Sequence, residues 1–274
     1  MGIKKAKPTS PACRFATWNI GASDKNARPP RSLRDILPNN AGRNNQGKIT
    51  ARHRGGRNKR FYRIVDFKRD KNNIPAVVES IQRDPNRTAE LALVSYSDGE
   101  KRFILHPLGL KIGDTILSGE SVEVSPGNCM LLKNIPLGIY VHNMELRPGQ
   151  GGKMARSAGS AAQVLARERG WVHLRMPSGE IRLIPSDCRA TIGELGNTDV
   201  KNVVLGSAGR SRHLGIRPKV RGVAMNAVDH PHGGGKGKGK GHNIPRSETG
   251  VLAKGFKTRK RKSSDSLIVH RRSR

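Results

Sequence analysis

The run Asp229-His230-Pro231-His232 groups three side chains that could bind a metal ion or transfer protons. A catalytic metal site usually takes three protein ligands whose orientation is fixed by neighbouring groups. Here the two histidines lie in a glycine-rich loop, and His242 follows only after a glycine run. Because such a loop does not hold a third ligand in place, we predict no metal and no catalytic residue here. We expect these side chains to hydrogen-bond RNA.

Lysines alternate with glycines directly after this run, at Lys236, Lys238 and Lys240. Glycine lets backbone N–H groups approach a phosphate closely. In an extended chain the three lysines would share one face, roughly 6.5 Å apart. A flexible cationic linker explains the repeat equally well. Crosslinking to RNA distinguishes the two interpretations, since the linker predicts no adduct within residues 233–241.

Other catalytic motifs do not fit. The stretch Gly149-Gln150-Gly151-Gly152-Lys153 resembles a phosphate loop, but Met154 stands where Ser or Thr is required and the glycine spacing differs. Neither G-x-G-x-x-G nor G-x-S-x-G occurs. Acidic residues in the middle of the chain are interspersed with basic ones, as on a solvated β surface. The sequence therefore predicts a binding protein that is not an enzyme.

Charge is unevenly distributed along the 274 residues, whose formal net charge is +31. Residues 1–60 hold 15 lysines and arginines against 2 acidic residues, and residues 201–274 hold 19 against 3. The segment between them holds 18 against 16. Two basic arms around a nearly neutral middle are typical of a folded core with polyanion-binding extensions. We expect the arms to order beside nucleic acid, because like charges repel in the free chain.

The composition indicates the size of the hydrophobic core and the redox state of the compartment in which the protein works. Hydrophobic content of 34% and aromatic content of 4% favour two small units of about 70 residues each over one large core. Cys13, Cys129 and Cys188 form no C-x-x-C pair, which fits a reducing compartment. No apolar run indicates a signal peptide or a membrane span. Neither arm has the apolar stripe of a membrane-surface helix.

Short strands with turn signals between them dominate the middle of the chain. A helical turn is predicted at Ser32–Leu37, where Ser32 and Asp35 have capping-box spacing. Asp98-Gly99 and Ser178-Gly179 predict hairpin turns. By helix propensity alone, Ala158–Glu168 would be a helix. The predicted strands are Phe61–Phe67, Ala76–Ile81, Leu91–Tyr96, Lys101–Leu105, Ile112–Leu117, Met130–Leu132, Tyr140–Leu146, Trp171–Met176, Ile181–Ile184 and Arg189–Leu195.

Strands of this length and spacing favour small β-barrels. We place a boundary near Leu146–Gly152 and a second limit near Gly196. The predicted division is a basic N-terminal extension at 1–58, a first barrel at 59–147, a second barrel at 148–196 and a basic C-terminal extension at 197–274. Because the aromatic cluster around Phe61 is small, affinity should come mainly from phosphate contacts.

The stretch from Arg221 to Gly235, with Asp-His-Pro-His-Gly-Gly-Gly at its end, closely resembles the signature of the large-subunit ribosomal protein L2 family of bacterial type. The resemblance extends over essentially the whole chain in family order. Its further landmarks are Lys7-Pro8-Thr9-Ser10-Pro11, Gly42-Arg43-Asn44-Asn45, Arg52-His53-Arg54-Gly55-Gly56, Tyr62-Arg63-Ile64-Val65-Asp66-Phe67-Lys68-Arg69, Asp84-Pro85-Asn86-Arg87, Asp98-Gly99-Glu100-Lys101-Arg102, Ala155-Arg156-Ser157-Ala158-Gly159 and Arg271-Arg272-Ser273.

The resemblance implies a mainly β fold, with an OB-fold RNA-binding barrel followed by an SH3-like barrel and a strand within Ala158–Glu168. It implies a structural protein of the large ribosomal subunit that binds large-subunit rRNA and supports subunit assembly, subunit association, tRNA binding and the peptidyl-transferase centre during translation. Expected partners are rRNA, other ribosomal proteins and the small subunit at the interface. No cofactor is expected beyond Mg²⁺ ions of the rRNA. No membrane partner is expected.

Asp229, His230 and His232 are expected near the peptidyl-transferase centre, where the RNA performs the chemistry. The expected location is the ribosome in the cytoplasm, without an attached presequence, although an organelle-encoded copy is an alternative. The complete set of predicted rRNA-binding residues is Arg52, His53, Arg54, Arg57, Lys59, Arg60, Arg63, Lys68, Arg69, Lys153, Arg156, Ser157, Arg210, Arg212, Arg217, Lys219, Arg221, Met225, Asn226, Asp229, His230, His232, Lys236, Lys238, Lys240, Lys257, Arg259, Lys260, Arg261, Lys262, Arg271 and Arg272.

Three departures from the family pattern affect the C-terminal arm. Ala227 stands where the family usually has proline, Lys236 replaces a usual glutamate, and Asn243–Val251 lacks the usual Thr-Pro-Trp-Gly. Two other functions compete with the structural one. An RNA-processing enzyme using Asp229 and the two histidines predicts metal-dependent turnover. A DNA-compacting protein predicts that duplex DNA competes with folded rRNA at moderate salt.

Overall fold

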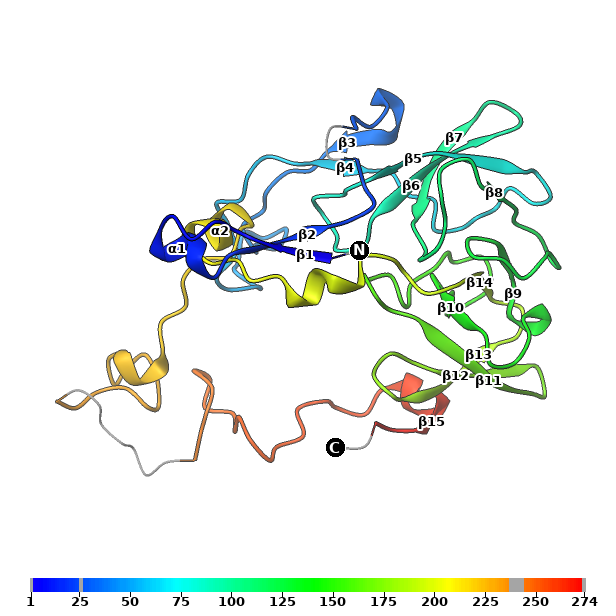
Figure 1. Cartoon of the computed structure of the whole chain (residues 1–274). Coiled ribbons are helices and arrows are strands. Elements are labelled where there is room, and N and C mark those ends of the chain that lie inside the picture. Colours follow the sequence, from blue (N-terminus) through cyan, green and yellow to red (C-terminus); the bar gives the residue numbers. More distant parts are fainter. Residues whose placement is uncertain (1, 25–26, 237–243, 273–274) are drawn as a thin grey trace. The chain divides into compact units, whose positions relative to one another are not determined.

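The computed structural model describes residues 2–24, 27–236 and 244–272, and its contacts divide into two units. We call Met1–Pro38, Lys59–Ala208 and Ser266–Arg274 the barrel unit, and Asn39–Asn58 with Gly209–Asp265 the arm unit. Most regular structure is β (Figure 1). Within the described ranges no helix has the length and apolar character needed to cross a membrane.

The first sheet of the barrel unit has four antiparallel strands in the order β7-β6-β5-β8. Strand β6 is buried on both faces, since Leu91 and Leu93 pack in one apolar cluster while Ala92 and Val94 pack in another. Gly99 closes the β6–β7 hairpin with a φ of 85°, as its Asp-Gly signal predicts. The strands are β5 (Ala76–Gln82), β6 (Leu91–Tyr96), β7 (Lys101–Leu105) and β8 (Thr115–Ile116).

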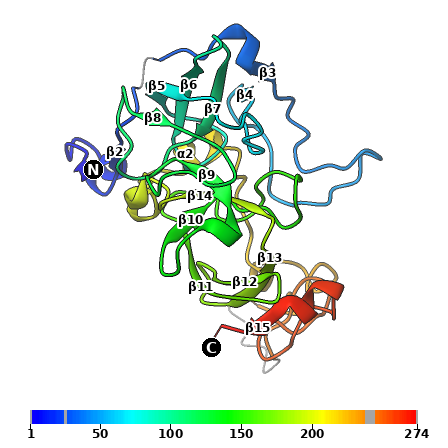
Figure 2. The same cartoon turned by 90° about the vertical axis from the view of Figure 1, so that its right-hand side faces the viewer.

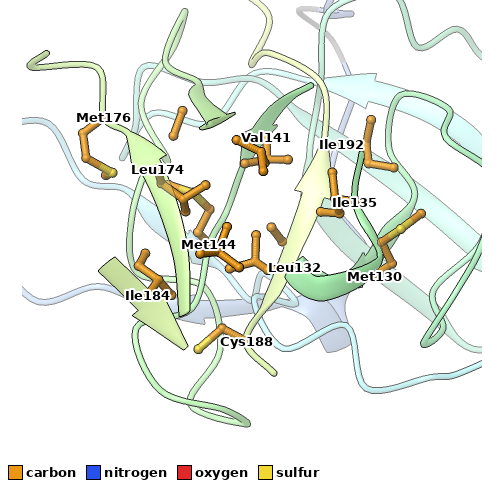
Figure 3. Packing of buried hydrophobic residues seen from close by; sticks show 14 residues of the cluster. Met130, Leu132, Ile135, Val141, Met144, Leu174, Met176, Ile184, Cys188 and Ile192 are labelled. Carbon is orange, nitrogen blue, oxygen red and sulfur yellow. The ribbon is translucent and has the colours of Figure 1, made fainter. Parts of the chain in front are cut away.

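The second sheet has seven strands in the order β15-β13-β12-β11-β10-β14-β9, and it curls around its own core (Figure 2). Met130, Leu132, Val141, Met144 and Leu174 are fully buried in that core (Figure 3). The strands are β9 (Cys129–Leu131), β10 (Tyr140–His142), β11 (Ala162–Glu168), β12 (Trp171–Arg175), β13 (Ile181–Pro185), β14 (Arg189–Ile192) and β15 (Ile268–His270). The two curled sheets confirm the predicted fold class, an OB-fold barrel followed by an SH3-like barrel with basic extensions.

Strand β11 shows tertiary structure overriding helix propensity. Its segment is rich in alanine, yet Ala162 and Val164 alternate with the less buried Gln163. It pairs with β10 on one side and β12 on the other. Because these partners satisfy its backbone groups on both edges, the strand suggested by the family resemblance is confirmed, and the helix expected from propensity is wrong.

The helical turn predicted at Ser32–Leu37 is wrong over its second half. A 3-10 turn, η1 (Arg31–Leu33), leads into strand β3 (Arg34–Ile36), which pairs with β4 (Phe61–Arg63). The Arg34 guanidinium lies 5.0 Å from the Phe61 ring centroid. Asp35 accepts a hydrogen bond from the Ile36 N–H at 2.7 Å instead of capping a helix. Cross-strand pairing therefore outweighs the capping signal.

Several predicted strands are shorter in the structure. Ile112–Leu117 contains only β8, and Tyr140–Leu146 contains only β10. Strands β9 and β10 belong to the second sheet, although they precede residue 148. The predicted domain limits at 58, 147 and 196 would separate parts that fold independently. These limits stay predictions.

The basic extensions contain short elements. A hairpin of β1 (Gly2–Lys5) and β2 (Thr17–Ile20) flanks helix α1 (Pro11–Arg14), whose N-cap Ser10 accepts a hydrogen bond from the Cys13 N–H at 3.3 Å. The C-terminal extension contains α2 (Ala208–His213) and the 3-10 turns η3 (Thr198–Asn202), η4 (Gly222–Ala224) and η5 (Ser263–Leu267).

The three cysteines are unpaired thiols, and Cys129 and Cys188 are buried. Burial raises the pKa of the Cys188 thiol to about 12. Burial also raises the pKa of Cys129. Since the thiolate is the nucleophile, both groups are unreactive near neutral pH, as expected for thiols without a chemical role.

Candidate nucleic-acid interface

Two basic segments from opposite ends of the sequence run antiparallel in the arm unit. Residues 53–58 and 213–217 are joined by backbone hydrogen bonds and an Arg54–Ile216 bridge. The sequence did not predict this pairing, because neither segment has strand-like alternation. The backbone bonds run from Gly55 N–H to Gly215 O at 3.0 Å, from Arg217 N–H to His53 O at 3.0 Å and from Asn58 N–H to His213 O at 3.1 Å.

The Asp229–Gly235 loop is closed by its own backbone. The Gly233 N–H donates to the His230 carbonyl at 2.9 Å, and the Gly234 N–H donates to the Met225 carbonyl at 3.1 Å. Asn226 accepts a hydrogen bond through Oδ1 from the Ala227 N–H at 2.6 Å. The proline that the family resemblance leads one to expect at 227 could not donate this bond. Ala227 thus replaces the ring constraint with a hydrogen bond.

His230 is a buried residue that supports this loop. Its Nδ1 accepts a hydrogen bond from the His232 N–H at 3.0 Å. The His232 ring lies 5.3 Å away, and its Nε2 accepts from the Arg246 N–H at 2.9 Å. One nitrogen of each ring is therefore an acceptor, and the other carries the proton in the neutral form. Neither accepting nitrogen is available as a general base.

Gly222 makes the burial of His230 possible. A Cβ added at Gly222 would lie 2.4 Å from His230 Cε1, closer than any van der Waals contact allows. The backbone of η4 therefore packs directly on the imidazole. Residue 222 must lack a side chain for the loop to close.

A cavity of about 630 Å³ lies in the arm unit beside His230. Its walls include Arg52, Lys219 and Arg221 from the predicted set. They also include Arg246, which the sequence analysis did not select. Glu248 is in the wall as well, and its carboxylate is ion-paired with Arg52. The wall holds more cations than anions, which suits a phosphate group.

Arg246 was missed because no local motif marks it. It follows the glycine–lysine run, and its backbone N–H donates to His232 beside the cavity. Lys238 and Lys240 lie outside the described residues, as does His242, so the predicted lysine face is not described. Lys236 is exposed. Among the described residues, no group of three or more His, Cys, Asp or Glu side chains is arranged to hold a metal ion.

In the barrel unit, Phe67 is the centre of a cationic cluster. The Arg156 guanidinium lies 4.4 Å from the Phe67 ring centroid, and that of Arg87 lies 5.5 Å from it. Lys68 and Lys153 line the adjacent cavity of about 430 Å³ together with Arg156. The structure thus brings three predicted residues together around one aromatic ring. Arg87 was selected only as a family landmark.

Carboxylates on the same side of the barrel unit fix Arg102. Its guanidinium pairs with Asp66 at 3.0 Å, with Glu100 at 2.6 Å and with Asp70. Burial lowers the pKa of Arg102, but the three carboxylates outweigh burial and raise it above its usual value. The hydrogen bond from Arg102 lowers the pKa of Asp70. Arg102 is therefore neutralised by the protein, unlike the lysines beside Phe67.

Glu145 positions the loop that carries Lys153. The carboxylate is buried, and it accepts backbone N–H groups from Gly151 at 2.8 Å, Arg189 at 3.0 Å and Gly149 at 3.3 Å. The phosphate-loop-like glycines therefore wrap around an acidic side chain of the protein itself. This arrangement explains their glycine content without a bound nucleotide.

Two predicted rRNA-binding side chains, Arg63 and Arg69, are buried in the barrel unit. Arg63 faces Asp84 at 3.8 Å, and burial lowers its pKa while Asp84 opposes that shift. Arg69 donates through a guanidinium nitrogen to the Gly127 carbonyl at 3.2 Å. Both make contacts inside the fold, and their predicted contact with rRNA stays a prediction.

The remaining predicted residues lie mostly on exposed segments. Arg210 and Arg212 are on α2, and Arg60 donates to the Pro85 carbonyl at 2.8 Å. Arg259 pairs with Asp265 within the basic run 257–262. Arg271 and Arg272 follow β15 and are exposed.

Comparison with known proteins finds two sequence profiles in this chain. "Ribosomal Proteins L2, RNA binding N-terminal domain" matches residues 31–118. "Ribosomal Proteins L2, C-terminal domain" matches residues 125–250. The chain is also similar to the large ribosomal subunit protein uL2 of Endomicrobium trichonymphae, with 54% identity over 274 residues that cover all of both chains.

Proposed function

Because the chain belongs to the ribosomal protein L2 family of the large ribosomal subunit, we propose that its two basic arms and its barrel unit bind large-subunit rRNA through phosphate contacts. The observation that carries this proposal is the cavity beside His230, where four cationic side chains from three separate segments meet one acidic side chain. Phosphate binding by convergent arginine and lysine gives affinity without reading sequence.

We further propose that the Asp229–Gly235 loop approaches the peptidyl-transferase centre and supports tRNA binding there. The loop contributes shape and charge, and peptide-bond chemistry stays with the RNA. The accepting nitrogens of His230 and His232 are both taken up by backbone N–H groups, which supports a structural role. We also propose that the protein supports assembly of the large subunit and its association with the small subunit. The proposed location is the cytoplasmic ribosome.

Variants in the loop test the proposal in reconstituted large subunits. Substitution His230→Ala should impair peptidyl transfer by the subunit while the purified protein keeps its thermal unfolding transition, since His230 belongs to the arm unit. Glu168→Ala, at an exposed position of β11, is the control and should leave both readouts unchanged. Loss of barrel folding in His230→Ala would contradict the assignment.

The competing functions predict different results for the free protein. Metal-dependent turnover of RNA by the purified chain would favour a processing enzyme. Competition by duplex DNA as strong as that by large-subunit rRNA, at moderate salt, would favour DNA compaction. The proposed function predicts neither result, and it predicts co-sedimentation with the large subunit through a high-salt gradient.

A further inference from the structure

The C-terminal strand β15 returns to the barrel unit and becomes the edge strand of the second sheet (Figures 1 and 2). It pairs antiparallel with β13, with Ile268 opposite Arg182 and His270 opposite Ile181. Only these two positions are in register, and the ladder is irregular between them. So short a strand gains little stability from backbone pairing alone.

One row of the sheet runs across three strands at this edge. Arg175 of β12 lies opposite Ile181 of β13, which lies opposite His270 of β15. Side chains directly opposite one another project from the same face of a sheet, with neighbouring strands about 4.8 Å apart. Arg175 and His270 therefore flank the same apolar side chain.

A cavity of about 360 Å³ opens on this face. Arg175, His270 and Arg272 line it together with Ser178 of the β12–β13 turn. Among the described residues that line it, none is acidic. Within the described parts of the chain, no ion pair joins Arg175, His270 or Arg272 to a carboxylate. Nearby Glu180 faces a different cavity and lies 4.0 Å from Arg182.

We propose that β15 and the β12–β13 turn together form an anion site that takes one rRNA phosphate, and that phosphate binding and docking of β15 stabilise each other. Docking brings Arg272 to the cavity that Arg175 lines, and a phosphate between the two guanidinium groups removes their repulsion, with His270 as a further hydrogen-bonding group. By linkage, each event must favour the other equally. This inference rests on the proposed function, and it adds Arg175, His270 and Ser178 to the interface.

Binding of the full-length protein to large-subunit rRNA tests the site. Arg175→Gln and Arg272→Gln should each weaken binding about 3- to 10-fold at moderate salt and lower the slope of log affinity against log salt by about one. Arg169→Gln removes the same charge from the β11–β12 turn, before the start of β12, and should change neither quantity. Because both arginines hold one phosphate, the double variant should lose much less than the product of the single losses.

Hydrogen exchange tests the coupling. Amides of residues 268–270 should become more protected when rRNA binds the wild-type chain, and clearly less so in Arg175→Gln, although Arg175 is outside that strand. Equal protection in the two proteins would overturn the coupling. If Arg175→Gln and Arg272→Gln bound rRNA with the same affinity and salt dependence as Arg169→Gln, the proposed site would be wrong. Those results leave the proposed function intact, whereas failure of the wild-type chain to bind rRNA would remove the proposed function itself.

Discussion

At the scale of single residues, the arm unit depends on close packing around one imidazole. His230 is buried although it lies in a segment dominated by glycine and basic residues, and its burial requires the missing side chain at Gly222. Charge and motif spacing select His230 as a candidate. They do not select Gly222, since a glycine in a glycine-rich segment carries no signal of its own.

The variant Gly222→Ala should open the loop around His230. The added methyl group overlaps the imidazole, and overpacking of this kind costs about 1–3 kcal/mol. We expect binding to large-subunit rRNA to weaken several-fold, with the thermal unfolding of the barrel unit unchanged. Gly209→Ala in α2 is the control, because no atom lies within 4 Å of its added Cβ. Equal rRNA affinity of both variants would contradict the packing role of Gly222.

His142 should make the stability of the barrel unit depend on pH. Burial lowers the pKa of His142 to about 4, and its Nδ1–H donates to the Gly193 carbonyl at 2.8 Å. Well above pH 6.5 the ring is neutral in both the folded and the unfolded state, and its contribution is fully present. As the pH falls from 6.5 towards 4, the unfolded chain takes up the proton first, so the free energy of unfolding decreases by about 3 kcal/mol.

Urea unfolding between pH 4 and 7.5 measures this effect. His142→Asn keeps a donor for Gly193 but cannot titrate, so its stability should vary less with pH over that window. His173→Asn, at a less buried position of the same sheet, should keep the wild-type pH dependence. Parallel curves for the wild-type protein and His142→Asn would rule out this role of His142.

At the scale of elements, a buried carboxylate organises the link between β10 and β11. Three backbone N–H groups converge on Glu145: those of Gly149 and Gly151 belong to the loop at residues 147–152, and that of Arg189 belongs to β14. A glutamine at position 145 would direct its NH₂ group, itself a donor, towards one or more of these backbone N–H groups and leave them without an acceptor. Unsatisfied buried donors cost about 1–3 kcal/mol each.

Glu145→Gln should therefore lower the free energy of unfolding by about 1–3 kcal/mol in urea titrations. It should also weaken rRNA binding, because Lys153 follows the loop directly. Glu168→Gln at an exposed position is the matched control and should stay within about 0.5 kcal/mol of the wild type. If Glu145→Gln were as stable as this control, the three bonds would not fix the loop.

The sequence predicts strands well where both the local pattern and the turn residues agree. Leu91–Tyr96 and Lys101–Leu105 coincide with β6 and β7, because Asp98-Gly99 fixes the register between them. The pattern fails at Arg34–Ile36 and Ala162–Glu168, where pairing with other strands decides the conformation. Local propensity contains no information about those partners.

The candidate site, like the fold, is predicted in part from the sequence. Charge and the Asp-His-Pro-His motif identify the basic arms and the loop around His230. They cannot identify Arg246 or Arg175, because local sequence does not show that Arg246 contacts His232 or that β15 brings His270 and Arg272 to the cavity lined by Arg175. Pairing of residues 53–58 with 213–217 escapes prediction for the same reason.

At the scale of the whole molecule, the uncompensated positive charge and the hydrophobic core lie in different parts of the chain. The apolar clusters lie in the barrel unit, while most of the arm unit is exposed and basic. Ion pairs with carboxylates neutralise Arg102 and Arg87 in the barrel unit, whereas the run 257–262 has few acidic neighbours. The protein therefore presents uncompensated positive charge, and binding to RNA should release many counterions.

The salt dependence of binding to large-subunit rRNA tests this account most directly. With six or more phosphates neutralised, affinity should fall by roughly 10³-fold or more between 50 and 200 mM salt. Folded rRNA should also compete for the protein better than duplex DNA of equal phosphate concentration at moderate salt. An affinity that changes little over that salt range would contradict the central claim that rRNA phosphates are what the basic arms bind.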